Sequence, residues 1–327
     1  MTTIAPEFKV QVADEQQDEK QEKDTDFLQA IIGGRTEEVD KLLQNSNDKA
    51  KNAFLAERDD DGFPPLLIAS KLGHEEIVKI LLGYEGKGVA VNEEILPTTD
   101  PTSENKALQD LKKTLAACGK PVQKIKRIRY TALLLASKHG HPRVVELLLN
   151  SGAKVNTCTG TSALRTASGF LHEECVRILL AHGADVSLRQ PETGTTALFS
   201  ASVVGHVGIA KMLIEHGADV NNTASGQRST CLMIATVMKH VDMMELLLKH
   251  GADPNRVNKD NMTVLWLAVM RGNADMQNLL LAHGAKATPG LLFGTTICAG
   301  PFTAMRMWEN RAWRLSDDVE KNHIIDK

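Results

Sequence analysis

The chain is poor in aromatic residues, which make up only 4% of its 327 residues. Such a low share is unusual in a β-sandwich or barrel, where aromatic side chains pack well, and is ordinary for stacked short helices. No apolar run approaches the roughly 18 residues of a membrane-spanning helix, and the polar N-terminal stretch does not read as a signal peptide. We therefore expect a helical protein without a membrane span.

Charge and cysteine are also unremarkable in amount. The net charge is −3 with 24% charged residues, which gives no reason to expect nucleic acid as a partner. The cysteines are odd in number, far apart and form no CxxC pair: Cys118, Cys158, Cys175, Cys231 and Cys298. This pattern favours reduced thiols in an intracellular protein, so we expect a cytoplasmic location, with the nucleus left open.

Catalytic motifs are missing. The sequence has no glycine-rich phosphate loop, no G-x-S-x-G elbow and no H-E-x-x-H pair. Cys175 lies close to His172 and two glutamates, which could form a Cys–His pair, but it falls at a position that other segments fill with Val144 or Ile209. We expect a core cysteine, no enzymatic activity and no cofactor.

A repeated segment dominates the rest of the chain. It reads "TALLLASKHGHPRVVELLLNSGAKVN" from Thr131, and related strings begin at Pro64, Ser162, Thr196, Thr230 and Thr263. One alanine marks each copy, at Ala69, Ala136, Ala167, Ala201, Ala235 and Ala268. After a first gap of 67 residues, these alanines are separated by 31, 34, 34 and 33 residues. A fixed period of this length is typical of a solenoid.

The composition of each copy explains how it would fold. A Thr or Ser at the start can cap a first helix, because its hydroxyl accepts from an unpaired backbone N–H. The alanine lets two helices lie close together, and the apolar residues of the second helix face neighbouring copies. Glycine follows that helix where a left-handed cap is needed, at Gly152, Gly183, Gly217, Gly251 and Gly284.

These strings strongly resemble the ankyrin repeat, with its T-P-L-H-x-A start, GH turn and final GAD-V-N, although the histidine of the first motif is absent. The resemblance implies an all-α ankyrin-repeat solenoid of about seven helix-turn-helix repeats. A decayed repeat or irregular insertion would occupy about residues 93–127. We expect a disordered acidic tail over residues 1–23, the array over 24–286, and a C-terminal capping segment over 287–327. In that segment, Trp308, Ala312, Leu315 and Val319 would share one helical face.

The repeat also accounts for nine of the eleven histidines. Five occupy the GH turn slot: His74, His141, His172, His206 and His240. Four precede the glycine cap: His182, His216, His250 and His283. Equivalent positions in a solenoid lie in rows about 10 Å apart, whereas a zinc site needs ligands that converge on one point. We therefore predict no metal site.

The resemblance further implies a non-enzymatic module that binds a protein or peptide partner in a concave groove. In the ankyrin family this groove is lined by loop tips and by the two residues before the GH turn. The candidate partner-binding residues are Lys71, Leu72, Tyr130, Lys138, His139, Phe170, Val203, Val204, Val237, Met238, Met270 and Arg271. Apolar pairs dominate the later part of the row, as in a protein-binding surface, although some could be ordinary packing.

A basic loop precedes the second clear repeat. It carries Lys120, Lys124, Lys126, Arg127 and Arg129. It would contact an acidic or phosphorylated partner, dock the acidic N-terminal tail, or simply be solvated.

Several strings are also similar to the N-terminal ankyrin array of the Fem family of cullin-RING substrate receptors. They are "PPLLIASKLGH" (Pro64–His74), "KVNTCTGTSALRTAS" (Lys154–Ser168), and "TCLMI" followed by "GADPNR". This similarity implies, as an alternative function, a substrate-recognition adaptor that binds ubiquitin-ligase subunits. Fem proteins that read a terminal arginine place an aspartate before the turn glycine, where this chain has Phe170 and then Leu171. A more apolar ligand is therefore expected.

Overall fold

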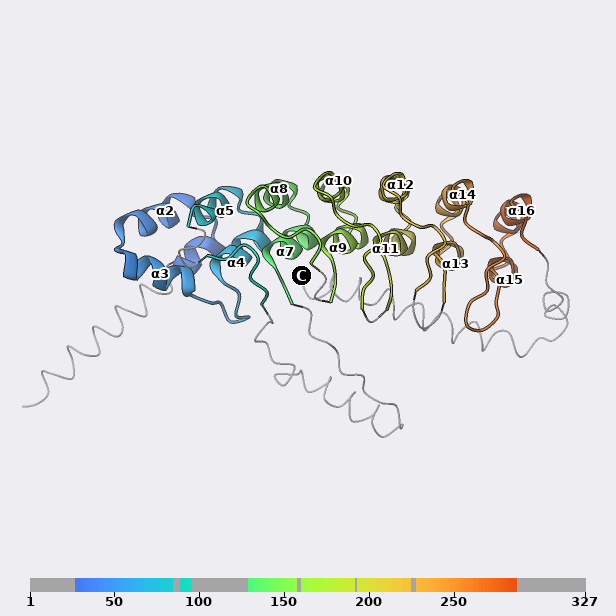
Figure 1. Ribbon diagram of the computed structural model, residues 1–327, viewed down its shortest axis with the longest axis horizontal. Helices are drawn as coiled ribbons and strands as arrows, with labels where there is room; N and C mark the ends of the chain where they lie inside the picture. The colour runs from blue at the N-terminus through green and yellow to red at the C-terminus, as the bar shows by residue number, and fades with distance from the viewer. Residues whose placement is uncertain are drawn as a thin grey trace, which may run out of the picture. The chain divides into compact units, whose positions relative to one another are not determined.

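The computed structural model describes residues 27–84, 89–95, 129–157, 160–191, 193–224 and 228–286. The chain divides into two compact units, Met1–Lys154 and Val155–Lys327. Each unit is built from pairs of antiparallel helices, and in the described residues β-structure is limited to isolated bridges (Figure 1). The all-α class and the helix-turn-helix repeats predicted from the sequence are confirmed.

The first unit begins with helical residues 27–32. Its other described helices are α2 (Thr36–Asn45), α3 (Asp48–Ala56), α4 (Pro65–Leu72), α5 (Glu75–Leu82), α7 (Ala132–His139) and α8 (Pro142–Asn150). The expected acidic tail lies outside the described residues. Helix α3 was not predicted, because its sequence lacks the repeat pattern. Asn47 caps this helix by accepting from the Ala50 N–H, and Phe54 stacks on Phe27 at 5.0 Å between ring centroids.

The second unit contains α9 (Ala163–Gly169), α10 (Glu173–Ala181), α11 (Ala197–Val204), α12 (Val207–Glu215), α13 (Cys231–Val237), α14 (Val241–Lys249), α15 (Val264–Met270) and α16 (Ala274–Ala282). The first helices of successive pairs, α9, α11, α13 and α15, pack side by side in one row (Figure 1). The second helices α10, α12 and α14 pack in a parallel row. The C-terminal capping segment predicted for 287–327 lies outside the described residues.

Hydroxyl caps start the first helices, as the sequence predicts. Five side chains accept from the backbone N–H three residues ahead: Thr131, Ser162, Thr196, Thr230 and Thr263. The glycines after the second helices all have positive φ, between 77° and 87°: Gly152, Gly183, Gly217, Gly251 and Gly284. The five pairs from α7–α8 to α15–α16 therefore begin and end at residues whose chemistry specifies those boundaries.

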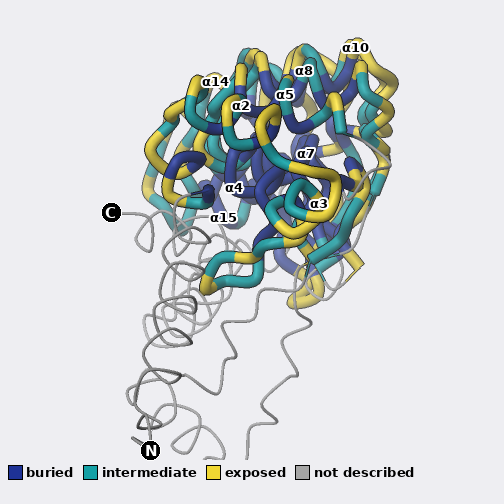
Figure 2. Tube along the Cα trace, turned by 90° about the vertical axis from the view of Figure 1, so that its left-hand side faces the viewer, coloured by how far each residue is buried: buried dark blue, intermediate teal, exposed yellow. Residues whose placement is uncertain are grey.

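The core lies between the two helices of each pair and between successive pairs. All six marker alanines are fully buried, which confirms their role as close-contact positions. The first helices are buried over most of their length, as α4 and α7 show, whereas second helices such as α5 and α8 expose one side (Figure 2). A second helix is therefore amphipathic, while a first helix meets solvent mainly at its last turn.

The insertion does not separate the repeats on either side of it. Helix α4 packs directly against α7, and His141 Nε2 donates to the Lys71 carbonyl at 3.0 Å. Asn92 donates to the Gly152 carbonyl at 3.1 Å and accepts from the Lys154 N–H at 2.7 Å. The sequence gap of about two periods is thus one step in the stack, and residues 96–128 lie outside the described region.

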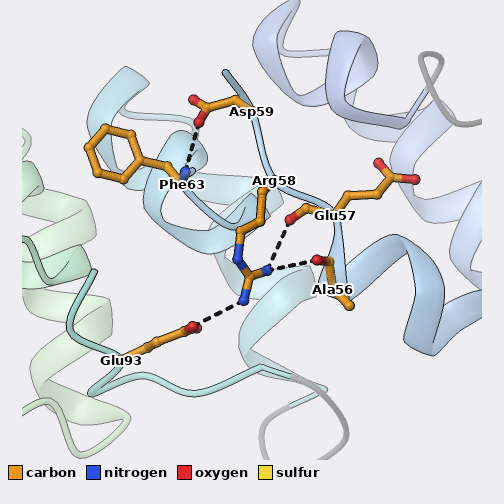
Figure 3. A network of polar contacts seen from close by, with 6 residues as sticks. All are labelled: Ala56, Glu57, Arg58, Asp59, Phe63 and Glu93. Atoms are coloured by element: carbon orange, nitrogen blue, oxygen red, sulfur yellow. Dashed lines mark hydrogen bonds and ion pairs between the residues drawn. The ribbon is translucent and has the colours of Figure 1, made fainter. Parts of the chain in front are cut away.

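Polar contacts hold the two ends of this insertion. Ile95 and Tyr130 exchange both backbone hydrogen bonds, at 2.9 and 2.8 Å. Nearby, the Arg58 guanidinium donates to the Ala56 and Glu57 carbonyls and to Glu93 Oε1, each at 3.0 Å (Figure 3). The chain therefore leaves and re-enters the array at one point that is tied to the preceding loop.

A row of asparagines joins successive loops of the second unit. Asn221 donates to the Gly251 carbonyl at 3.0 Å and accepts from the Asp253 N–H at 2.8 Å. Asn156 and Asn255 make the same pair of bonds to the loops that follow them. Ser187 takes this place between α10 and α11, and its hydroxyl bonds locally to Asp185. That junction consequently lacks the asparagine bridge.

Candidate functional site

In two of the residue pairs before the turns of the second unit, the two residues have unequal exposure. Val203 and Val237 are 5% and 6% exposed, whereas Val204 and Met238, one residue later, are half-exposed. Val203 and Val237, two of the candidate partner-binding residues, are thus packed in the core, which is the alternative that the sequence left open for some of these residues. Val203 follows the buried Phe199 by four residues, as Val237 follows Met233, so each valine extends the buried face of its helix.

The remaining candidates of this unit are available at the surface. Phe170, Met270 and Arg271 are half-exposed, like Val204 and Met238. The Phe170 ring lies nearly parallel to that of His172, at 6.4 Å between centroids. Three apolar side chains therefore lie directly before the turns, at the ends of the first helices of successive pairs: Phe170, Val204 and Met238.

Sequence reasoning missed Leu171 as a surface residue. It is 50% exposed and occupies the turn slot that holds Gly73, Gly140, Gly205 and Gly272 in other repeats. Its φ is 67°, in the left-handed region that costs a residue with a Cβ roughly 1–2 kcal/mol. A leucine side chain at this position gains little burial to offset that strain. The signal in the sequence was a leucine at a turn position that is glycine in four other repeats.

The leucine also changes how the next repeat attaches. At Gly205, a Cβ would lie 2.6 Å from His240 Nδ1, and the His240 Nε2 donates to the Val203 carbonyl at 3.0 Å. The equivalent histidine after Leu171 is His206. Its Nδ1 instead accepts from the Ile209 N–H at 3.1 Å, and its Nε2 lies 3.7 Å from Glu173 Oε2. Where a side chain occupies the turn, the histidine of the next repeat thus contacts a glutamate of the preceding repeat, whereas His240 bonds to a backbone carbonyl.

Lys239 repeats this arrangement one turn further on. It is exposed, has a φ of 64°, and again stands in the glycine slot. The next repeat has Asn273 in the histidine position, where it caps α16 by accepting from the Met276 N–H. We name the set Phe170, Leu171, Val204, Met238 and Lys239 the turn surface. It is apolar over four residues and ends in a cation.

Two of the described candidates of the first unit, Tyr130 and Arg129, contact neighbouring residues of the array, and the others lie at the surface. Tyr130 is paired with Ile95, and its ring meets the buried Phe63 edge-on at 5.7 Å. Arg129, the only basic-loop residue among those described, forms an ion pair with Glu94 at 3.3 Å. Lys120, Lys124, Lys126 and Arg127 lie outside the described residues. Leu72 is exposed, and the other three candidates are half-exposed: Lys71, Lys138 and His139.

Two cysteines are described, and both are core residues. Burial raises the pKa of the Cys175 thiol to about 12, with a contribution from the charge of Glu174. Burial likewise raises the pKa of Cys231 to about 12. Because the thiolate is the nucleophilic form, Cys175 is unsuited to nucleophilic catalysis.

We expect both thiols to react with iodoacetamide at pH 8 at least 100-fold more slowly in the native protein than in urea, because burial blocks access and disfavours the thiolate. Peptide mass spectrometry would follow Cys175 and Cys231 separately. Since both pKa values are raised from an ordinary value of about 9, their stabilising contribution is complete below pH 9 and declines toward pH 12. Native labelling at the unfolded rate would contradict this expectation.

No group of three or more His, Cys, Asp or Glu side chains among the described residues is arranged to hold a metal ion. The histidines before the glycine caps bond locally instead: His182, His216 and His283 each direct Nδ1 at the carbonyl four residues earlier. None of the described helices is long and apolar enough to span a bilayer.

A stack of helix pairs that presents turns and last helical residues to solvent forms the kind of extended surface that repeat proteins use for binding. Family models agree. The model for three copies of ankyrin repeats matches residues 103–190, 133–224 and 222–290, and a single-repeat model matches residues 61–93. The chain belongs to the ankyrin-repeat family, whose members are protein–protein interaction modules.

Two relatives are similar over part of the chain. An ankyrin repeat and KH domain-containing protein of Caenorhabditis briggsae is 32% identical over 183 residues, which are 51% of this chain and 7% of that protein. Ankyrin repeat domain-containing protein 29 of Danio rerio is 42% identical over 62 residues, 18% of this chain and 21% of that protein. The chain thus aligns with less than a quarter of either relative's length.

Proposed function

We propose that the chain is a non-enzymatic recognition module that binds a protein or peptide partner on the turn surface. Leu171 is the observation that carries this proposal. It combines an exposed apolar side chain with a backbone conformation that glycine would adopt without strain, and neither feature improves the fold. Strained backbone of this kind is held in place by the surrounding structure and is found preferentially at ligand-binding and other functional sites.

The neighbouring side chains define the partner's chemistry. Phe170, Val204 and Met238 would bury against apolar side chains of the ligand, and the thioether of Met238 adapts to different shapes. Lys239 is exposed at one end and would attract a carboxylate. We therefore expect an extended or helical segment with apolar anchors and an acidic residue near one end, bound in the cytoplasm.

The decisive variant is Leu171→Gly, because folding and binding should respond in opposite directions. Relief of the left-handed strain should raise the free energy of unfolding by about 0.5–1 kcal/mol. Loss of the exposed leucine should weaken partner binding about tenfold, a modest effect for a partly buried anchor. Affinity capture from a cell lysate would identify the partner, and titration with that partner would measure the loss.

Lys239→Gly is the matched control. It removes a side chain from the same turn slot, with a similar gain in stability, but leaves the apolar anchors in place. A partner that binds Leu171→Gly and wild type equally would contradict the proposal. Equal losses for both glycine variants would assign the effect to the backbone of the turns rather than to the leucine.

A second proposal rests on the strings shared with the Fem receptors: an adaptor that presents substrates to a cullin-RING ubiquitin ligase. It requires ligase subunits in the captured material, in addition to the ligand of the turn surface. Cullin or elongin subunits that remain bound to Leu171→Gly, while the ligand is lost, would support it. Their absence from wild-type captures would contradict it.

A further inference from the structure

Two kinds of bond hold successive repeats of the second unit together, one at each end of the helices. At the turn, a histidine donates to a backbone carbonyl of the preceding repeat, as His240 does to Val203. At the loop, an asparagine bridges to the loop that follows, as Asn221 does to Gly251. Hydrogen bonds are directional, so each of these bonds fixes the position of one repeat on the next.

We name each junction between repeats by the residue in its turn slot. The Leu171 junction joins α9–α10 to α11–α12, the Gly205 junction joins α11–α12 to α13–α14, and the Lys239 junction joins α13–α14 to α15–α16. The Gly205 junction has both bonds. The Lys239 junction has the asparagine bridge, from Asn255 to Gly284 at 3.0 Å, without the histidine bond.

Among the described residues, the Leu171 junction has neither bond. His206 Nε2 lies 3.7 Å from Glu173 Oε2, which is too far for a hydrogen bond. Ser187 occupies the asparagine position, and its hydroxyl bonds to Asp185 of its own loop. This junction therefore lacks, at both ends of its helices, the directional bonds that fix the next junction.

Helix packing holds the Leu171 junction together instead. Helix α9 packs on α11, α10 packs on α12, and the buried residues of α10 and α12 are all apolar. Arg189 Nη1 also donates to the Thr223 carbonyl across this junction, at 3.3 Å. The corresponding bond one repeat later, from Arg256 to Asn221, is shorter at 3.0 Å. Because apolar contacts are not directional, they keep the two repeats together without fixing their relative position along the helices.

We propose that the pair α9–α10 slides against the pair α11–α12, while the Gly205 junction stays fixed. Small sliding movements of packed helices are a known form of conformational change, on a timescale of microseconds to milliseconds. The turn surface crosses the moving junction, because Phe170 and Leu171 lie before it and Val204 lies after it. Sliding therefore changes the spacing of these side chains. The movement is a property of the free chain, so this inference does not depend on the proposed function.

Amide-nitrogen relaxation dispersion of the free, full-length chain tests the proposal, because it detects movement on this timescale. Residues 170–173 and 204–207, the two turns at the Leu171 junction, should show exchange contributions at least about threefold larger than those of residues 238–241. Equal contributions at all three turns would overturn the proposal, as would their absence from the first two.

Ser187→Asn supplies the missing bridge. Gly217 and Asp219 stand where Gly251 and Asp253 accept and donate one repeat later, so the new side chain has the same two partners available. The exchange contributions of residues 170–173 and 204–207 should fall at least about twofold. Ser187 is exposed in a loop, so the substitution should leave the fold intact. Unchanged contributions in this variant would overturn the proposal.

Asn221→Ser is the matched control, because it introduces the same defect at the Gly205 junction. Residues 251–255, the loop that loses its bridge, should then show exchange contributions that are absent in the wild-type chain. These contributions should stay smaller than those at the Leu171 junction, since the bond from His240 to Val203 remains. If residues 251–255 showed none, the asparagine bridges would not restrain the repeats, and the proposal would be wrong.

Discussion

Replacing Gly205 by alanine should lower the free energy of unfolding by about 3 kcal/mol, because two costs combine. The φ of Gly205 is 76°, a conformation that costs alanine about 1–2 kcal/mol. The new Cβ would also lie 2.6 Å from His240 Nδ1. Displacing this ring breaks its bond to the Val203 carbonyl, a loss of about 1–3 kcal/mol for a part-buried acceptor. Urea unfolding followed by circular dichroism would measure the change.

Gly217→Ala separates the two costs. Gly217 has a similar φ, 87°, but no atom lies within 4 Å of the position that a Cβ would take. We expect this control to lose about 1 kcal/mol, from backbone strain alone. The chain contains a natural precedent for a smaller effect, since His206 adopts another arrangement beside Leu171. If both variants lost the same free energy of unfolding, His240 would be able to adopt the arrangement of His206 without further loss of stability.

Replacing Ala235 by leucine should cost about 3 kcal/mol, the upper end of the usual range for overpacking a core. Ala235 is fully buried in α13, which packs against α11, α14 and α15, so added methyl groups have neighbours on several sides. The larger side chain would force the helices of this repeat apart. The loss would appear in urea unfolding, with faster amide exchange in α13 and α14.

Ala181→Leu provides the comparison for this variant. Ala181 is the last residue of α10 and is exposed, so leucine there should change stability by less than about 0.5 kcal/mol. If Ala235→Leu were equally mild, the alanine column would not set the distance between the paired helices. The fold would then depend on the leucine-rich second helices alone.

Much of this fold could be predicted from the sequence, because its determinants are local and repeated. A threonine that caps a helix, a buried alanine and a left-handed glycine each have one physical role, and the period places them in register. Histidines that suggest a metal or catalytic site in a single repeat are explained as structural residues when the same position is histidine in most repeats. Six copies of one arrangement therefore specify the class more firmly than any single motif.

The surface was harder to predict, because exposure at a helix end depends on the neighbouring repeat. Val203 and Val204 are adjacent valines, yet only the second reaches solvent. The four-residue spacing from the buried Phe199 contained this information. The left-handed backbone of Leu171 was harder to predict, since a leucine at a position that is glycine in other repeats could equally have changed the conformation of the turn. Helix α3 has no repeat signature, so its place depends on contacts such as the Phe27–Phe54 stack.

The closure at Ile95 and Tyr130 has a consequence for how such an array can change. Because the backbones pair where the insertion begins and ends, the 34 intervening positions connect two points of the stack that lie side by side. Their length and composition can vary without shifting the register of α4 on α7. Residues that bind new partners, including a cluster of lysines and arginines, can therefore be inserted at this point. The stability of the array would change little, because each repeat contacts only its neighbours.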